Sequence, residues 1–260
     1  MQIDLSGRVA LITGASQGLG RAMAMRFAAS GADVAMLARG TEALEAAVAE
    51  IGQFAPGRIL AVPCDITDPS VREAAITRVA ANLGGVDILV NNAGSSRRGP
   101  VEDQDRDVML GDLDLKLLSP LELIRAVVPS MKARKWGRII NITAIVGKAP
   151  DGGSLPTSVS RGAGITMTKA LSKELAPWNI LVNTLCVGKI KSGQWERRYA
   201  ASGAGQSYDE FLRPVGDTVP LKRMGEAEEF ANVACFLASD AASYVTGTAI
   251  NVDGGLCAVT

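Results

Sequence analysis

Histidine is missing from this sequence of 260 residues. A Ser-His-Asp triad, a histidine general acid and a histidine-ligated metal site are therefore excluded. Cysteine is also scarce, because there are only four and none belongs to a Cys-x-x-Cys pair. Neither a zinc site nor a disulfide framework is indicated, so we expect no bound metal and a reducing, cytoplasmic environment.

The chain also lacks an excess of charge of either sign. It has 27 Lys+Arg and 27 Asp+Glu, whereas nucleic-acid-binding proteins normally carry a basic surplus. No apolar run approaches the roughly 18 residues of a membrane span, and we expect Val9–Thr13 to be a first strand rather than part of a signal peptide. The sequence thus favours a globular protein that binds neither nucleic acid nor membrane.

Short β-branched apolar runs alternate with amphipathic stretches along the chain. The expected strands are Val9–Thr13, Val34–Ala38, Ile59–Cys64, Ile88–Asn91, Arg138–Ile142, Ile180–Leu185 and Ala249–Val252. The expected helices include Arg21–Ala29, Glu42–Ile51, Ser70–Leu83, Ser158–Leu175 and Glu226–Leu237. This alternation predicts βαβ units and hence an α/β fold with a doubly wound parallel sheet, the Rossmann fold. We expect residues 1–260 to form a single domain, with residues 187–220 as an insertion that covers the site.

A glycine-rich turn lies between the first expected strand and the first expected helix, with the sequence Thr13-Gly14-Ala15-Ser16-Gln17-Gly18-Leu19-Gly20. Backbone N–H groups at a helix N-terminus can contact a pyrophosphate only where no Cβ intervenes. A tight structural turn would also use glycine, but this position directly after a strand favours a dinucleotide cofactor.

The end of the second expected strand bears on the choice between NAD and NADP. A carboxylate there would bind the adenosine ribose, whereas an arginine accommodates a 2′-phosphate. This sequence has Ala38-Arg39 and no acid at that point. NADP(H) is therefore favoured over NAD(H), unless Arg39 is a solvated surface residue.

Together with the glycine-rich turn, several later motifs resemble those of the short-chain dehydrogenase/reductase family, in the family's order. The similar stretches are Thr13–Gly20, Cys64–Ile66, Asn91–Gly94, Arg138–Ile142, Ile180–Asn183 and Asn251–Gly255. The resemblance runs from about Gly7 to Gly255. It implies a Rossmann fold, a nicotinamide cofactor and a small-molecule substrate.

The same resemblance implies which residues contact the cofactor. They are Gly14, Ser16, Gln17, Gly18, Leu19, Gly20, Arg39, Asp65, Ile66, Asn92, Ala93, Gly94, Arg161, Gly188 and Ile190. It also implies a homotetramer or homodimer, of which we expect the tetramer. The corresponding interface segments are Leu113–Arg134, Ser158–Leu175 and Tyr244–Cys257.

When these motifs are matched to those of the family, all four positions of its catalytic tetrad of Asn, Ser, Tyr and Lys carry a different residue in this sequence. Its Tyr-x-x-x-Lys pair falls on Thr157 and Arg161, its serine on Ala144 and its asparagine on Asp114. Three tyrosines exist, but none has a lysine four residues later. The family's tyrosine is a general acid, and a threonine hydroxyl is a poor substitute because an alcohol is far less acidic than a phenol of pKa about 10.

The candidate catalytic residues are therefore Asp114, Thr143, Thr157 and Arg161. Arg161 keeps the charge that would hold the nicotinamide ribose, but it does not release a proton. Thr157 or Thr143 would bond the substrate carbonyl, and the proton would come from solvent or from the substrate. Asp114 either pairs with Arg161 or lies on an exposed helix face.

Three functions stay open at this point. The favoured one is an NADP(H)-dependent oxidoreductase for a carbonyl or alcohol substrate, because the cofactor carries the hydride chemistry. The second is a nucleotide-binding protein with non-redox acid/base chemistry through Asp114 or Asp151. The third is a non-catalytic binding or assembly protein, since a fold does not fix a function.

Basic and aromatic residues near the expected substrate site leave the substrate undetermined. Arg97, Arg98 and Lys148 would favour an anionic substrate unless they are solvated loop charges. Trp195 and the residues up to Tyr199 are expected to form a short amphipathic lid helix.

Overall fold

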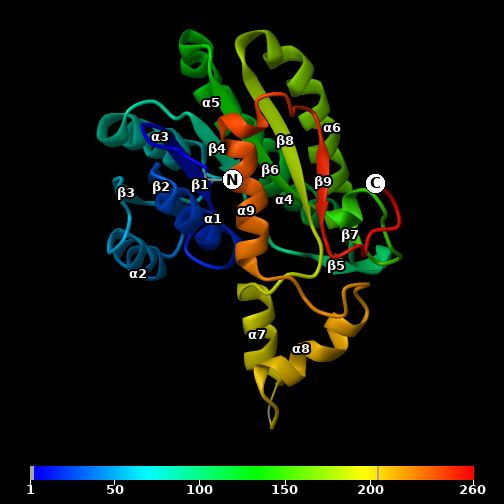
Figure 1. The fold of residues 1–260 in the computed structure, drawn as a ribbon. Coiled ribbons are helices and arrows are strands. Elements are labelled where there is room, and N and C mark those ends of the chain that lie inside the picture. Colours follow the sequence, from blue (N-terminus) through cyan, green and yellow to red (C-terminus); the bar gives the residue numbers. More distant parts are fainter. Residues whose placement is uncertain (1–2, 204) are drawn as a thin grey trace.

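Seven parallel strands form one sheet in the computed structural model, which describes residues 3–203 and 205–260 (Figure 1). The strands are β1 (Val9–Thr13), β2 (Asp33–Ala38), β3 (Ile59–Pro63), β4 (Ile88–Asn91), β6 (Gly137–Ala144), β8 (Ile180–Val187) and β9 (Ala249–Val252). Their order is β3-β2-β1-β4-β6-β8-β9, so the winding direction changes between β1 and β4. That change is the switch point at which open α/β sheets bind ligands.

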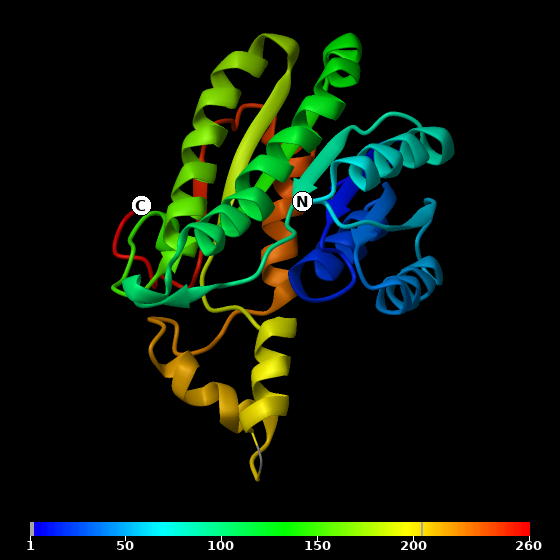
Figure 2. The same ribbon diagram turned by 180° about the vertical axis from the view of Figure 1, so that it is seen from behind.

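Helices cover both faces of the sheet (Figures 1 and 2). One face carries α1 (Gly18–Ala29), α2 (Thr41–Gly52) and α9 (Ala227–Ala238). The other carries α3 (Pro69–Leu83), α5 (Ser119–Arg134) and α6 (Thr157–Leu175). The remaining elements are α4 (Arg106–Leu113), α7 (Gly193–Ser202), α8 (Tyr208–Asp217) and a two-stranded antiparallel pair of β5 (Arg98–Gly99) and β7 (Leu155–Pro156). The predicted doubly wound α/β fold is confirmed.

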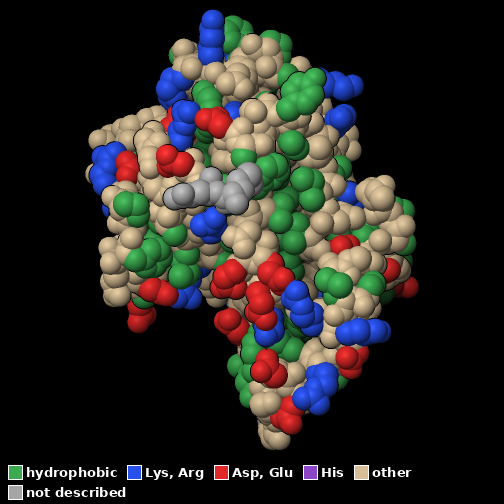
Figure 3. All heavy atoms as spheres, viewed as in Figure 1, with side chains coloured by type: hydrophobic (Ala, Val, Ile, Leu, Met, Phe, Trp, Pro, Cys, Tyr) green, Lys and Arg blue, Asp and Glu red, His purple; other side chains and the backbone are tan. Residues whose placement is uncertain are grey.

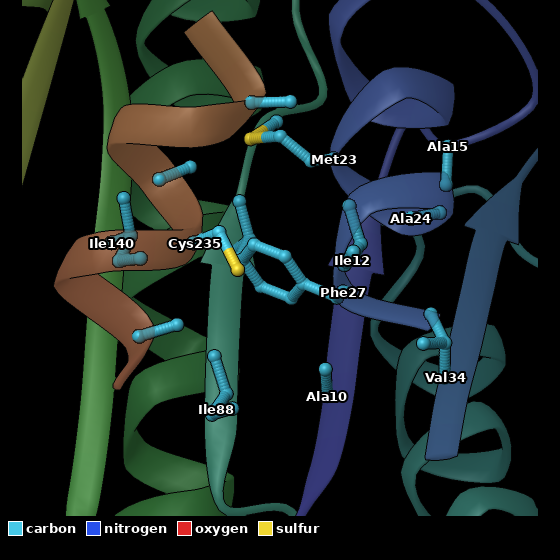
Figure 4. Packing of buried hydrophobic residues seen from close by; sticks show 14 of the residues in the cluster. Ala10, Ile12, Ala15, Met23, Ala24, Phe27, Val34, Ile88, Ile140 and Cys235 are labelled. Atoms are coloured by element: carbon cyan, nitrogen blue, oxygen red, sulfur yellow. The ribbon is translucent and has the colours of Figure 1, made fainter. Parts of the chain in front are cut away.

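The core lies between the sheet and these two helical layers. Figure 4 shows the ring of Phe27 from α1 beside Cys235 from α9, over strand residues such as Ile88. All three side chains are fully buried. Because central strands are covered on both faces, β1 and β4 are buried at every position, which is why their sequences are continuous apolar runs.

Helices α7 and α8 form an arm that projects from the body beside the C-terminal edge of the sheet (Figures 1 and 2). Tyr199 and Tyr208 join the two helices, with ring centroids 5.3 Å apart. Lys191 lies 2.8 Å from Glu226 at the start of α9 and ties the arm to the body. Figure 3 shows acidic and basic side chains gathered at this junction. The expected lid helix around Trp195 is thus part of a two-helix arm.

Across residues 3–203 and 205–260, every helix is too short or too polar to cross a membrane.

Candidate active site

A cleft of about 600 Å³ opens at the carboxyl ends of β1, β4, β6 and β8. Its floor runs from the glycine-rich turn past Asn92 and Gly94 to Thr157 and Arg161. The arm supplies the opposite wall through Trp195 and its neighbours. One continuous space therefore joins the expected nucleotide end to the expected catalytic end.

The glycine-rich turn has the backbone shape that a phosphate-binding turn needs. Gly14 and Gly18 have φ values of +64° and +54°, in the left-handed region that favours glycine. At Gly20 a Cβ would lie against the Gly14 carbonyl oxygen and 2.6 Å from the Asn92 side-chain nitrogen. Gln17 precedes α1 without a side-chain cap, so the first N–H groups of this helix are available to an anion.

Asn92 and Thr13 hold that turn in place. The Thr13 hydroxyl accepts hydrogen bonds of 2.9 Å from the backbone N–H groups of Asn92 and Ala93. In return, the Asn92 amide donates to the Thr13 and Gly14 carbonyl oxygens, at 2.9 and 3.1 Å. The turn is therefore fixed by the strand on the other side of the switch point.

The far end of the nucleotide path is a shallow hollow lined by Arg39 and Asp65. The Arg39 side chain is 81% exposed and lies 4.0 Å from the Asp65 carboxylate. Asp65 accepts hydrogen bonds from the N–H and hydroxyl of Thr67, at 3.0 and 2.7 Å, and these bonds lower its pKa. Its carboxylate is thereby occupied within its own turn, while Arg39 is open to a ligand. Ile66 beside them is buried.

Most of the residues expected to contact cofactor line the cleft. They are Gly14, Gln17, Gly18, Leu19, Gly20, Asn92, Gly94, Arg161, Gly188 and Ile190. Ser16 lies outside this lining, and Ala93 lines a small adjoining cavity.

Arg161 lies in the second turn of α6 and is held against the sheet. Its Nη1 donates to the Ile142 carbonyl oxygen at 2.6 Å. Its Nη2 lies where a Cβ on residue 94 would come within 2.8 Å, so Gly94 makes room for the guanidinium. Burial lowers the pKa of Arg161 to about 10, and the group therefore keeps its charge at neutral pH. Its position suits a cation that binds ribose hydroxyls.

Lys116 is the residue that sequence reasoning missed. It lies in a π-helical turn, Asp114–Leu118, between α4 and α5, and such turns are frequent at functional sites. Its side chain is 0% exposed, and its ammonium donates to Asp112 and, at 2.9 Å, to the Thr157 hydroxyl. Burial lowers the pKa of Lys116 to about 8, although the bond to Asp112 opposes this shift.

The two partners of Lys116 are themselves hydrogen-bonded. Asp112 accepts a 2.6 Å hydrogen bond from the Ser160 hydroxyl. The Thr157 hydroxyl donates to the Arg97 carbonyl oxygen at 2.7 Å and accepts from the Arg97 N–H at 3.0 Å. Thr157 also lines the cleft, so its hydrogen bond with Lys116 connects the buried lysine to the cleft wall.

The other expected catalytic side chains lie elsewhere. Asp114 forms no ion pair with Arg161 within the described ranges, although the sequence left that pairing open. Thr143 is buried, its hydroxyl lies 3.2 Å from the Cys186 sulfur, and it is outside the cleft lining. Ala144 does line the cleft. The structure thus brings Thr157 and Arg161 together with Lys116 rather than with Asp114.

The basic residues expected near the substrate are partly occupied. Lys148 donates to the Ala249 carbonyl oxygen at 2.5 Å and is absent from the cleft lining. Arg98 lines the cleft 4.0 Å from Asp151, an exposed acid at the same rim.

Comparison with known proteins gives consistent matches over most of the chain or all of it. The family model described as Enoyl-(Acyl carrier protein) reductase matches residues 14–257. Oxidoreductase UcpA of Escherichia coli O157:H7 is 36% identical over 255 residues, which are 96% of this chain and 95% of UcpA. L-Sorbose reductase from Gluconobacter frateurii, complexed with NADPH and L-sorbose, has a TM-score of 0.94 and 32% identity over 100% of both chains.

A further solved structure is an NADPH-bound short chain oxidoreductase from Pseudomonas aeruginosa PAO1 that contains an atypical catalytic center. It has a TM-score of 0.92 and 32% identity, over 99% of this chain and 100% of its own.

Proposed function

Because the chain belongs to the short-chain dehydrogenase/reductase family, we propose that it is an NADP(H)-dependent oxidoreductase that interconverts a carbonyl and an alcohol on a small-molecule substrate. The observation that carries this proposal is the single cleft that joins the glycine-rich turn to Thr157 and Arg161. A cofactor seated on the turn and a substrate beside Thr157 would share that space, which is the geometry that hydride transfer requires.

Several groups in the cleft support NADP(H) as the cofactor. The uncapped start of α1 and the glycine-rich turn would hold the pyrophosphate, and Arg161 would hold the nicotinamide ribose. Arg39 would pair with the 2′-phosphate, and no acid follows β2 to bind an unmodified ribose instead. Bound NADPH would supply the hydride.

The substituted tetrad is part of the proposal. In place of the family's tyrosine, lysine and serine, Thr157 would contact the substrate oxygen and Arg161 would fix the ribose, with Ala144 contributing only its methyl group to the cleft wall. Support comes from the NADPH-bound Pseudomonas aeruginosa protein, which is 32% identical and has an atypical catalytic center of its own.

The test has two steps. Calorimetry with NADPH and NADH comes first, followed by a panel of carbonyl compounds scored by loss of NADPH absorbance. Keto sugars belong in the panel, because the L-sorbose reductase shares the whole fold. We expect NADPH to bind and to be consumed with at least one compound. Tight binding without turnover would favour a non-redox function, and absence of nucleotide binding would favour a non-catalytic protein.

A further inference from the structure

A chain of polar side chains leads from the cleft into the interior of the protein. Thr157 is its first member and lines the cleft. Lys116 follows, with its ammonium 2.9 Å from the Thr157 hydroxyl and its side chain fully buried. Deeper in the protein lie Asp112, whose side chain is 4% exposed and contacts Lys116, and Ser160, whose hydroxyl donates to Asp112. Lys116 itself lines a small adjoining cavity, and its hydrogen bond to Thr157 connects it to the cleft wall.

A purely structural explanation of this lysine is weak. A buried ion pair contributes little net stability, because both charges lose their hydration. Here the ammonium also lies near two further cations, Arg161 on α6 and Arg97 before β5, and within residues 3–203 and 205–260 the carboxylate of Asp112 on α4 opposes them. Such surroundings suit a group that gains and loses its proton, which lysine does when buried and arginine does not.

Resting on the proposed function, we infer that Lys116 supplies the proton of carbonyl reduction and that the Thr157 hydroxyl passes it to the substrate oxygen. In the reduction the carbonyl carbon accepts a hydride from NADPH, and the C=O π pair moves to oxygen. That oxygen takes the Thr157 hydroxyl proton while the Thr157 oxygen takes a proton from the Lys116 ammonium. The products are the alcohol, NADP⁺ and a neutral Lys116 amine, which regains its proton from solvent.

The relay needs one rearrangement. The Thr157 hydroxyl donates to the Arg97 carbonyl oxygen and accepts from the Arg97 N–H and from the Lys116 ammonium, so its three hydrogen-bonding positions are filled. For the transfer, the Thr157 side chain gives up both bonds to Arg97, turns its proton toward the cleft and keeps the Lys116 ammonium as its donor. Since both transfers occur together, the effective acid is the lysine and not the alcohol. A pKa of about 8 for that lysine lies close to neutral pH, and a general acid is most efficient when its pKa is near the pH at which it works.

The variants Thr157→Val, Thr157→Ser and Lys116→Met test the relay. Single-turnover hydride transfer should fall by about 10²–10⁴-fold in Thr157→Val and in Lys116→Met, the usual loss on removing a general acid. Thr157→Ser keeps the hydroxyl and should stay within about tenfold of the parent. The combined variant should lose little more than either single one, because the two residues act as one unit. The parent rate should fall as pH rises through about 8, and this fall should vanish in Lys116→Met.

A second readout needs no substrate. In the protein labelled with ¹³C at the lysine ε-carbon, one NMR signal should titrate near pH 8 and be missing from Lys116→Met. Should Lys116→Met fail to fold, this titration and the Thr157→Val and Thr157→Ser pair decide the matter.

The outcomes separate the relay from the proposed function. A loss below about tenfold in Thr157→Val, the cost of a single neutral hydrogen bond, would reduce Thr157 to an orienting role and overturn the relay alone. A lysine signal that titrates at its ordinary position would overturn it as well. A parent protein that binds NADPH but reduces nothing would overturn the proposed function, and the relay with it.

Discussion

Replacing Lys116 by Met and Asp112 by Asn in one variant removes both charges of the buried pair while keeping side chains of similar size. The folded-state pKa of Lys116 is about 8, below its ordinary value of 10.5. Below pH 8 both the folded and the unfolded chain hold this proton. The free energy of unfolding is therefore lowered by the full cost of burying the ammonium. At about 1.4 kcal/mol per pKa unit, that cost is about 3 kcal/mol.

The sign of the pH dependence follows from proton binding. Between pH 8 and 10.5 the unfolded chain still holds the proton that the folded chain has released, so stability rises with pH. Only the parent contains Lys116. We therefore expect its unfolding free energy to gain on the order of 2–3 kcal/mol over that of the double variant between pH 7 and pH 10.

Denaturant unfolding followed by tryptophan fluorescence measures this difference at each pH. Titrating groups other than Lys116 and Asp112 are common to both proteins and cancel in the comparison. A difference that stays constant from pH 7 to pH 10 would refute the reasoning, because Lys116 would then have the same pKa in both states. The single variant Lys116→Met controls for the loss of one partner alone, because it leaves the Asp112 carboxylate buried without its cation. Its free energy of unfolding should be about 3–5 kcal/mol lower than that of the parent.

Three further predictions concern the cofactor and the assembly. Arg39→Asp should reverse a preference for NADPH over NADH in calorimetry, and equal or tighter NADH binding by the parent would contradict this cofactor assignment. Gly20→Ala should abolish NADPH binding, because its Cβ would press on the backbone of Gly14, whereas Gly40→Ala has open space around it and should bind normally. Light scattering at micromolar concentration should give a homotetramer, since apolar side chains such as Leu118 (49% exposed) lie open near the start of α5. A monomeric mass would count against that assembly.

The strands could be predicted closely because burial on both faces produces continuous apolar runs. Val9–Thr13 and Ile88–Asn91 match their observed bounds. The other predicted helices also start within one residue of the observed positions, and the exception is the first one. The first helix begins at Gly18 rather than at Arg21, because the glycine-rich turn itself forms the first helical turn. Glycine has low helix propensity, so a pattern of apolar spacing does not reveal that start.

The candidate site was only partly predictable for a different reason. Thr157 and Arg161 could be found by motif spacing within one helix. Lys116 could not, because its contact with Thr157 joins residues 41 positions apart and depends on a π-helical turn that breaks the 3.6-residue period. Its one local sign was Asp112 four residues earlier, a spacing that usually marks an exposed surface pair.

The bonds between Thr13 and Asn92 also bear on how the protein folds. These residues are 79 positions apart: Thr13 ends β1 and Asn92 directly follows β4, on either side of the switch point. The nucleotide turn therefore acquires its final shape only after the β4 strand has docked on β1, a long-range event that is slow to form. A fragment ending before residue 88 would contain the whole glycine-rich motif but would lack Asn92, which holds the turn in place. Nucleotide binding consequently reports on completion of the central sheet, and added NADPH should stabilise the native protein by mass action.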